Sequence, residues 1–276
     1  MTPPSSSPAP KTPSPAASFV SGQFCSVDLA ASDMDAAAAF YRSLFDWSAE
    51  PQDAGGGPPY AFFVLDGDVV AGLGELSDER RADGAPPSWG SYVQTDDIQT
   101  LTERAAALGG TVLVPPMPIP RFGWVAFLQD PTGAHLGLWQ SGEFRGAERV
   151  GGPGSFCWNE LVTPDLEAAQ AFYGPLFDWT FTEHPESSEP YVVIHTGSAE
   201  ASTEVGGMLQ MTDDWGDAPP HWAVYFAVED ADASANRLQA LGGRVLHGPF
   251  DLSVGRMAAV ADPQGATFNL IALTRG

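Results

Sequence analysis

Hydrophobic and polar residues change period along the first 75 residues of the chain, from strand-like to helical and back. Apolar residues recur at helical spacing at Met34, Ala37, Ala38, Tyr41 and Phe45. The expected elements are strands at Phe24–Ala30, from Trp47, at Tyr60–Leu65 and at Val69–Leu73, with a helix from Ser32 or Asp33 to Phe45. The pattern predicts the order β-α-β-β-β.

The same order recurs directly afterwards. A second helix begins at Asp96 or Asp97 and ends at Gly109 and Gly110, a typical helix stop. The expected strands are Trp89–Thr95, Thr111–Val114, Trp124–Leu128 and His135–Trp139. A tight Asp-Pro-Thr-Gly turn separates the last two strands.

The whole arrangement is then repeated at an offset of 132 residues. Residues 22–47 and 154–179 align without a gap, and 14 of the 26 positions are identical. A period this long indicates duplicated domains rather than a solenoid. We expect a disordered tail at 1–20 rich in Pro, Ser and Ala, domains at 21–142 and 154–274, and a linker at 143–153. The β-α-β-β-β modules are expected at 21–77, 88–142, 154–212 and 221–274.

Composition narrows the class of protein. Lys and Arg number 12 against 35 Asp and Glu, so the net charge of −23 disfavours nucleic-acid binding. No apolar run is long enough to span a membrane, and the first residues lack the apolar core of a signal peptide. We therefore expect a cytoplasmic protein, and a monomer whose four modules pair internally. Cys25 and Cys157 are expected to point into separate cores without forming a disulfide.

The motifs of both copies resemble the vicinal oxygen chelate superfamily, which includes glyoxalase I, bleomycin-resistance proteins and extradiol dioxygenases. The motifs are Ala-Phe-Tyr-x-x-Leu-Phe-Asp-Trp at 39–47 and 171–179, Leu-Gly-Gly after each second helix, and the Asp-Pro-x-Gly turns. The resemblance implies an α+β fold, in which paired modules curl their mixed sheets into a cup that holds the ligand.

Metal-using members of that superfamily hold a divalent metal with four side chains, usually His and Glu, from the first and last strand of each module. The corresponding positions here lack such residues: Ser26, Gly90, Gly137 and the segment 71–73 in the first domain, Trp158, Ala223, Asn269 and the segment 205–207 in the second. We therefore expect no metal or other cofactor. A relocated site that uses His135, Glu160 or Asp28 is the alternative.

Strand alternation assigns side chains to the inside of each cup. Glu160 and Asp28 are the candidate catalytic residues, since a carboxylate in an apolar site has a raised pKa and can act as a base. The alternative is a solvated carboxylate near the mouth. The expected ligand-binding residues are Trp158, Tyr225, Asn269, Tyr92, His135 and Trp139. Cys25 and Cys157 then face the helices, where Asn159 is the one discordant polar residue.

Arg121 and Arg256 lie in loops near the cups and are candidates to clamp an anionic group, with solvent-exposed arginines as the alternative. Trp89 and Trp222 are expected to pack in the core. The aromatic lining favours a metal-free protein that binds a small, partly aromatic molecule. The alternatives are an enzyme (lyase, isomerase or hydroxylase-like) that uses a cup carboxylate or a relocated metal, and a scaffold with vestigial cups.

Overall fold

A computed structural model describes residues 17–53, 57–82, 84–185, 189–197 and 203–274. Most of the expected tail, residues 1–16, lies outside this part. Residues 17–20 were expected to be disordered, but Ala17 N–H donates to Glu148 C=O at 3.3 Å and Phe19 packs against the first domain. The elements of the first domain are β1 (Phe24–Ala31), α1 (Met34–Phe45), β2 (Ser48–Gln52), β3 (Tyr60–Leu65), β4 (Asp68–Glu75), α2 (Asp78–Ala82), β5 (Ser88–Gln94), α3 (Ile98–Ala107), β6 (Thr111–Ile119), β7 (Gly123–Gln129) and β8 (His135–Ser141).

The second domain repeats this order. Its elements are β9 (Phe156–Thr163), α4 (Leu166–Phe177), β10 (Thr180–Glu183), β11 (Tyr191–Thr196), β12 (Thr203–Gln210), a 3-10 turn η1 (Asp213–Trp215), β13 (His221–Ala227), α5 (Ala231–Ala240), β14 (Arg244–Leu252), β15 (Gly255–Ala261) and β16 (Thr267–Leu273). The four β-α-β-β-β modules predicted from the sequence are confirmed.

Aspartates fix the start of the four long helices. Each N-cap carboxylate accepts a hydrogen bond from the backbone N–H three residues later, as Asp33 does from Ala36 at 2.9 Å. Asp97, Asp165 and Asp230 do the same for the other three helices. Of the two starts that the sequence allowed for each helix of the first domain, the structure selects Asp33 and Asp97.

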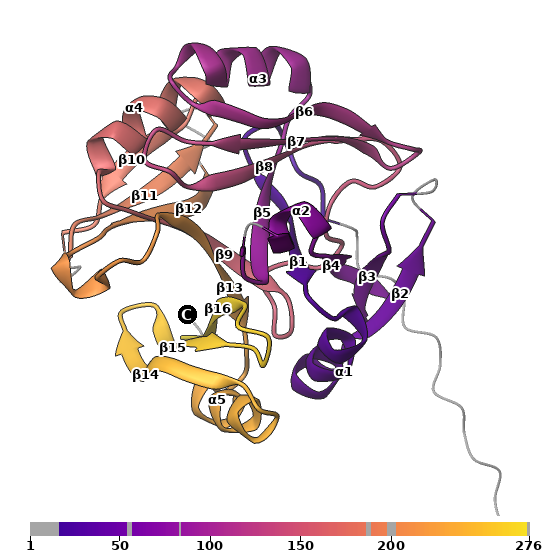
Figure 1. Cartoon of the computed structure of the whole chain (residues 1–276). Coiled ribbons are helices and arrows are strands. Elements are labelled where there is room, and N and C mark those ends of the chain that lie inside the picture. The colour runs from indigo at the N-terminus through magenta and orange to yellow at the C-terminus, as the bar shows by residue number, and fades with distance from the viewer. Residues whose placement is uncertain (1–16, 54–56, 83, 186–188, 198–202, 275–276) are drawn as a thin grey trace, which may run out of the picture.

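Each domain is one mixed sheet of eight strands. The strand order is β2-β3-β4-β1-β5-β8-β7-β6 in the first domain and β10-β11-β12-β9-β13-β16-β15-β14 in the second. The two modules of a domain meet where β1 pairs antiparallel with β5, and β9 with β13. Each sheet therefore curls into a single concave surface, cup 1 in the first domain and cup 2 in the second, and Figure 1 shows the two opening away from each other.

The helix-bearing backs of the two sheets pack together into one continuous core. Aromatic rings from both domains fill it, and Phe24 of β1 contacts Trp179 and Trp222 at centroid distances of 5.8 and 5.0 Å. Asn159, discordant in the sequence, lies on this shared surface, where its Oδ1 accepts a hydrogen bond of 2.7 Å from Ser91 of the other domain. The polar residue is thus paired across the interface between the domains.

The motifs shared by the two copies meet at the same interface. Trp89 Nε1 donates to the hydroxyl of Tyr41 on α1, which in turn donates to Asp262 Oδ2 at 3.1 Å. Asp262 belongs to the Asp-Pro-Gln-Gly turn of the other domain, and its Oδ1 accepts the backbone N–H groups of that turn. The equivalent tryptophan–tyrosine hydrogen bond in the second copy runs from Trp222 Nε1 to the Tyr173 hydroxyl at 3.0 Å. The expectation that both tryptophans pack in the core agrees with their exposures of 7% and 5%.

The expected linker, 143–153, lies against the first domain rather than crossing solvent. Ala147 N–H donates to Cys25 C=O at 2.8 Å, and Glu148 N–H donates to Val69 C=O at 2.7 Å. Arg149 forms an ion pair of 2.9 Å with Asp68. These contacts hold the segment along β1 and β4.

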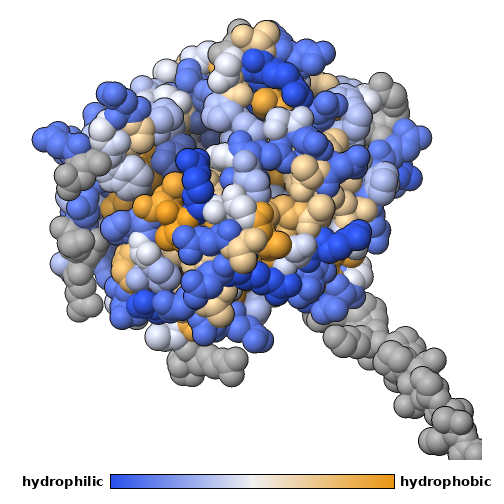
Figure 2. Space-filling model, turned by 60° about the horizontal axis from the view of Figure 1, so that its bottom comes forward, coloured by the Kyte–Doolittle hydropathy of each residue, from blue (hydrophilic) through white to orange (hydrophobic). Residues whose placement is uncertain are grey.

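Figure 2 shows polar residues over most of one face, with hydrophobic groups gathered near its middle. Within the described residues, no helix combines the length and apolar character that a membrane crossing requires.

Candidate functional site

A hydrogen-bonded group of four side chains forms the floor of cup 2. Tyr225 of β13 donates its hydroxyl proton to Glu160 Oε1 of β9 at 2.8 Å. Tyr191 of β11 makes a second hydrogen bond to the same carboxylate, and Trp158 Nε1 donates to the Tyr191 oxygen at 3.1 Å. Three strands therefore converge on one carboxyl group.

Burial of this carboxyl group dominates its acidity. Glu160 is 8% exposed, and the loss of hydration raises its pKa to about 7, although the hydrogen bonds from Tyr225 and Tyr191 act in the opposite direction. The same burial, with the negative charge of Glu160, raises the pKa of Tyr225 well above its ordinary value. Near neutral pH Glu160 can thus accept or release a proton, while the tyrosines remain hydrogen-bond donors.

Cup 1 has an equivalent hydrogen-bonded group, in which Asp28 takes the place of Glu160. Tyr92 of β5 donates to Asp28 Oδ2 at 2.7 Å, and Tyr60 of β3 lies beside this pair. Burial raises the pKa of Asp28 to about 6, against the hydrogen bond from Tyr92 and the positive charge of Arg80 on α2. Both predicted carboxylates therefore lie on cup floors, each with two tyrosines.

Glycines make room for the second tyrosine of each group. Gly207 pairs with Glu160 and Gly72 pairs with Asp28 in the parallel ladders. A Cβ atom at Gly207 would lie 1.9 Å from the hydroxyl oxygen of Tyr191, and one at Gly72 would lie 2.0 Å from that of Tyr60. The sequence interpretation missed Tyr60 and Tyr191. Their signal is a tyrosine after proline at the start of the third strand in both copies.

Asn269 marks the clearest polar difference between the cups. It lies on β16 beside Tyr225, where cup 1 has Gly137 beside Tyr92. Its side chain is 8% exposed and its amide makes no hydrogen bond to any described residue. Its amide atoms are not among the fully buried unpaired atoms of the described residues, so solvent can reach them and they are available to a ligand.

The residues of the cup floors do not fit the His and carboxylate set that a divalent metal requires. Glu160 is flanked across the ladders by Gly207 and Ala223, and Asp28 by Gly72 and Gly90. The described residues contain no group of three or more His, Cys, Asp and Glu side chains that would surround a metal ion. The groups that hydrogen-bond to the Glu160 carboxylate are the hydroxyls of Tyr225 and Tyr191, which act as donors to it.

The remaining predicted ligand-binding residues are distributed differently. Trp139 lies in cup 1, 8% exposed, whereas His135 is exposed at the start of β8 and contacts Gln129 at 3.2 Å. Arg121 is exposed in the turn between β6 and β7, with its guanidinium carbon 4.7 Å from the centre of the Phe122 ring. Neither His135 nor Arg121 joins the group around Asp28.

Arg256 was expected near the ligand, and the structure corrects this. Its guanidinium pairs with Asp232 of α5 and with Asp251, at 2.5 and 2.9 Å. The helix lies behind the sheet, and the next residue, Met257, packs with Tyr225 on the concave face. Strand alternation therefore directs Arg256 away from cup 2.

Both cysteines were expected to face the helices, and both lie on the concave side instead. The ladder between β1 and β5 shifts by one residue between Phe24 and Ser26, and a matching shift lies between Tyr225 and Phe226 in the ladder between β13 and β9. These β-bulges turn Cys25 and Cys157 toward the cups. Burial raises the thiol pKa of Cys157 to about 12 and that of Cys25 further, so neither is a reactive thiolate.

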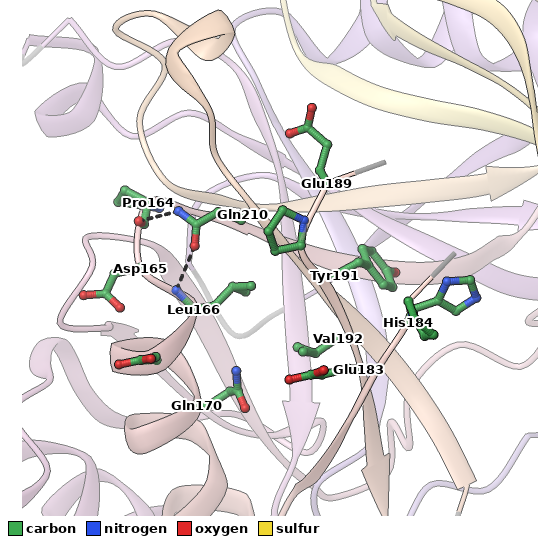
Figure 3. A pocket seen from close by; sticks show the side chains of 13 residues that line it. Pro164, Asp165, Leu166, Gln170, Glu183, His184, Glu189, Tyr191, Val192 and Gln210 are labelled. Carbon is green, nitrogen blue, oxygen red and sulfur yellow. Dashed lines mark hydrogen bonds between the residues drawn. The ribbon is translucent and has the colours of Figure 1, made fainter. Parts of the chain in front are cut away.

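A separate pocket of about 710 Å³ lies at the outer edge of the second domain, between the start of α4 and strands β10 and β11 (Figure 3). The acidic residues Asp165, Glu167, Glu183 and Glu189 line it. Gln210 closes one side by hydrogen bonding to Pro164 C=O and Leu166 N–H. Tyr191 lines this pocket while its hydroxyl belongs to the Glu160 group, so the pocket adjoins cup 2 from outside and does not contain the Glu160 carboxylate.

The architecture and the twin cups define a known family. Residues 23–138 and 156–270 each match the Glyoxalase/Bleomycin resistance protein/Dioxygenase superfamily. The chain therefore belongs to this superfamily, which confirms the resemblance seen in the sequence motifs.

Two relatives match this chain over nearly the whole length of both proteins. "Putative glyoxylase CFP32" of Mycobacterium tuberculosis is 38% identical over 248 residues, covering 89% of this chain and 92% of the relative. "Anthracycline biosynthesis protein DnrV" of Streptomyces peucetius is 35% identical over 271 residues, covering 94% of this chain and 96% of the relative.

Solved structures agree on the fold. The Mn(II)-bound glyoxalase from Novosphingobium aromaticivorans superimposes with a TM-score of 0.62 at 18% identity, over 92% of this chain and 83% of that one. The 2,3-dioxygenase LapB from Pseudomonas sp. KL28 gives 0.59 at 14% identity, over 90% of this chain and 91% of that one. At these identities the likeness concerns the fold alone.

Proposed function

We propose that this chain binds a small, partly aromatic organic molecule in cup 2 without a metal ion. The observation that carries the proposal is the floor of that cup, where Glu160, Tyr191, Tyr225 and Asn269 present polar groups within an apolar wall. Such a combination of a broad apolar surface and a few fixed polar groups is typical of small-molecule sites.

The chemistry of the ligand follows from these groups. Glu160 accepts hydrogen bonds, so it suits a hydroxyl or another N–H or O–H group of the ligand. The Asn269 amide offers a donor and an acceptor, which suits a carbonyl or a second hydroxyl. Trp158, Met257, Ile271 and Phe250 supply apolar surface beside them. A hydroxylated or ketonic aromatic compound meets all three requirements, and relatives named for anthracycline biosynthesis support the same ligand class.

Calorimetric titration of protein treated with a chelator tests this proposal. We expect a hydroxylated aromatic probe such as 1,4-dihydroxyanthraquinone to bind, and Glu160→Gln and Asn269→Ala to weaken binding. The matched variant in the other cup, Asp28→Asn, is expected to leave the affinity unchanged. Binding that appears only after Mn(II) or Zn(II) is restored would contradict the metal-free mode.

A second candidate function is proton transfer catalysed at the same floor. The raised pKa of Glu160, about 7, favours it, because a base of this acidity works efficiently at neutral pH. Glu160 would take a proton from the carbon next to a ligand carbonyl. The electron pair of the broken C–H bond would form a C=C bond with the carbonyl carbon, and the π electron pair of the C=O bond would move onto the oxygen. The Asn269 amide and the tyrosine hydroxyls are the donors available to the resulting enolate.

Deuterium exchange separates binding from this catalysis. An aromatic ketone with acidic C–H bonds, such as 2-tetralone, is incubated in D₂O and followed by NMR. The enzyme hypothesis expects exchange faster than in buffer, lost in Glu160→Gln and retained in Asp28→Asn. If the ketone binds but its exchange is not accelerated, the enzyme hypothesis is contradicted and only the binding function is supported. A cytoplasmic monomer remains our proposal for the state in which either function operates.

A further inference from the structure

Five phenylalanines lie on the concave side of the first sheet: Phe127 contacts Tyr92 at 5.7 Å, and the other four are Phe19, Phe62, Phe122 and Phe144. The rings of Phe62 and Phe144 stack at a centroid distance of 4.7 Å, and Phe122 meets Phe62 edge-on at 5.8 Å. Phe19 packs against Cys25 on the same concave surface. We call these four residues the phenylalanine plug.

The plug is anchored by segments outside the sheet. Phe144 belongs to the segment that follows β8, and its carbonyl accepts a hydrogen bond of 3.0 Å from Trp139 Nε1. Phe19 precedes β1, and a Cβ atom at Gly146 would lie 2.9 Å from its ring. The chain thus folds its own rings over the apolar half of cup 1, beside the Asp28 group.

The equivalent positions in the second domain carry no ring. Phe62 pairs with Gly72, as Val193 pairs with Gly207. Phe122 precedes Gly123, as Val254 precedes Gly255, and both glycines have φ of +154°. The offset of 132 residues matches Phe19 with Gly151 and Phe144 with Gly276, and Gly276 lies outside the described residues. Four phenylalanines therefore correspond to two valines and two glycines.

Cup 2 shows the consequences of these replacements. Val254 is 51% exposed, and Trp158 on the floor is only partly buried. Trp158 replaces Ser26, so an indole ring lies at the base of cup 2, beside Phe250 and the small residues at the four plug positions. Asn269 lies on the same floor, and its amide atoms are not among the fully buried unpaired atoms of the described residues. An apolar surface and a polar group that a ligand can reach thus occur together where the four rings are replaced.

We infer that the phenylalanine plug occupies in cup 1 the place that the planar ring system of a ligand occupies in cup 2. The chain then has one ligand site for two cups. The inference rests on the proposed function for the location of that site, and adds that cup 1 is closed by its own side chains. A ligand that stacks on Trp158 and takes the place of these rings is a flat molecule of more than one ring.

The test transfers the plug in both directions. The closing variant, Val193→Phe with Val254→Phe, puts two of the rings into cup 2. The opening variant, Phe122→Val with Phe144→Gly, removes two from cup 1. Val20→Phe adds a ring at a position that is 62% exposed and serves as the control. Equilibrium dialysis with 1,4-dihydroxyanthraquinone, read by visible absorbance, gives the number of probes per chain and their affinity.

We expect one probe on the wild-type chain and on the control. The closing variant should lose about tenfold or more in affinity, and the opening variant should bind a second probe. A closing variant that is folded by circular dichroism and keeps wild-type affinity would overturn the inference, as would an opening variant that still binds one probe.

Where the opening variant does not fold, Phe144→Ala alone replaces it, with toluene as the probe. A cavity left by a missing ring binds small aromatic molecules, so toluene should raise the Tm of Phe144→Ala more than that of the wild type, and equal shifts would overturn the inference. A wild-type chain that binds no dihydroxyanthraquinone overturns the proposed function together with the cup 2 half of the inference. Unchanged binding in the closing variant overturns the inference alone.

Discussion

At the scale of single residues, the two cups contain the same group built around different acids. Asp28 and Glu160 each accept a hydrogen bond from a tyrosine on the neighbouring strand. Burial raises the pKa of both, to about 6 and about 7. Both copies have a carboxyl group at a buried position where ionisation is unfavourable, and such perturbed acids are typical of functional sites.

The cost at Glu160 has a definite pH dependence. Its pKa is near 4.5 in the unfolded chain and about 7 in the folded one, so between these values the folded protein holds more protons. The free energy of unfolding must therefore fall as the pH rises through this window. Glu160→Gln lacks this loss and should gain up to about 3 kcal/mol relative to the wild type between pH 4 and pH 8.

Denaturant unfolding at several pH values measures this gain. Glu103→Gln, an exposed substitution on α3, is the control and should follow the wild-type curve at every pH. A difference between Glu160→Gln and wild type that is constant with pH would show that the carboxyl group ionises normally in the folded state.

At the scale of elements, two features of the strands place the site: the β-bulges and the glycines opposite each carboxylate. The alternation of residues in Phe24–Ala30 correctly placed Asp28 in the cup, since it lies beyond the bulge. It misplaced Cys25, because the β-bulge between Phe24 and Ser26 adds one residue to β1 and so changes which side of the sheet the residues at the bulge face. The residue types around Cys25 do not indicate that a bulge occurs there.

Other parts of the site also depended on long-range contacts that a single sequence does not contain. Tyr191 reaches Glu160 only because Gly207, sixteen residues further along, leaves space for its ring. Arg256 was assigned to a loop, whereas it lies on β15 facing Asp232. The modules themselves could be predicted, because helix caps and period changes are local, and the concave surface followed from the resemblance.

Gly207→Ala tests the role of the glycine. The added methyl group would overlap the Tyr191 hydroxyl, so the tyrosine must move and the hydrogen bonds from Trp158 and to Glu160 must break. Overpacking of this kind costs about 1–3 kcal/mol. Thermal unfolding measures the loss, with Gly152→Ala as the control, since nothing lies within 4 Å of a Cβ atom there. Equal stability of both variants would show that Tyr191 has room to shift without cost.

At the scale of the whole molecule, the residues shared by the two copies belong mainly to the contact between them. Tyr41 and Tyr173 of the first helices, Trp89 and Trp222 of the central strands, and the Asp-Pro-x-Gly turns all meet there. Trp47 Nε1 donates a hydrogen bond to Gly154 C=O, and Trp179 Nε1 donates one to Gly22 C=O. Each domain thus binds the backbone just before the first strand of the other domain. The motifs that identified the family therefore hold the domains together.

Such an interface predicts cooperative unfolding of both domains. Tyr41→Phe removes the hydroxyl between Trp89 and Asp262, and leaves the indole N–H and a carboxylate oxygen without a partner. The cost should be about 1–3 kcal/mol, visible as a lower midpoint of a single denaturant transition. Ser43→Ala on the exposed side of the same helix is the control. Two separate transitions in the wild-type chain would contradict this coupling.

The two cups face in opposite directions, and the residues shared by the two copies lie between them. The residues that hold the domains together are therefore different from the residues that line the cups. Among the described residues, the apolar clusters on the two concave sides have no member in common. Residues that line either cup can therefore be substituted without altering the interface between the two domains. For an engineer, the chain is a scaffold with two concave faces, and each can be redesigned for a different compound while the other is left unchanged.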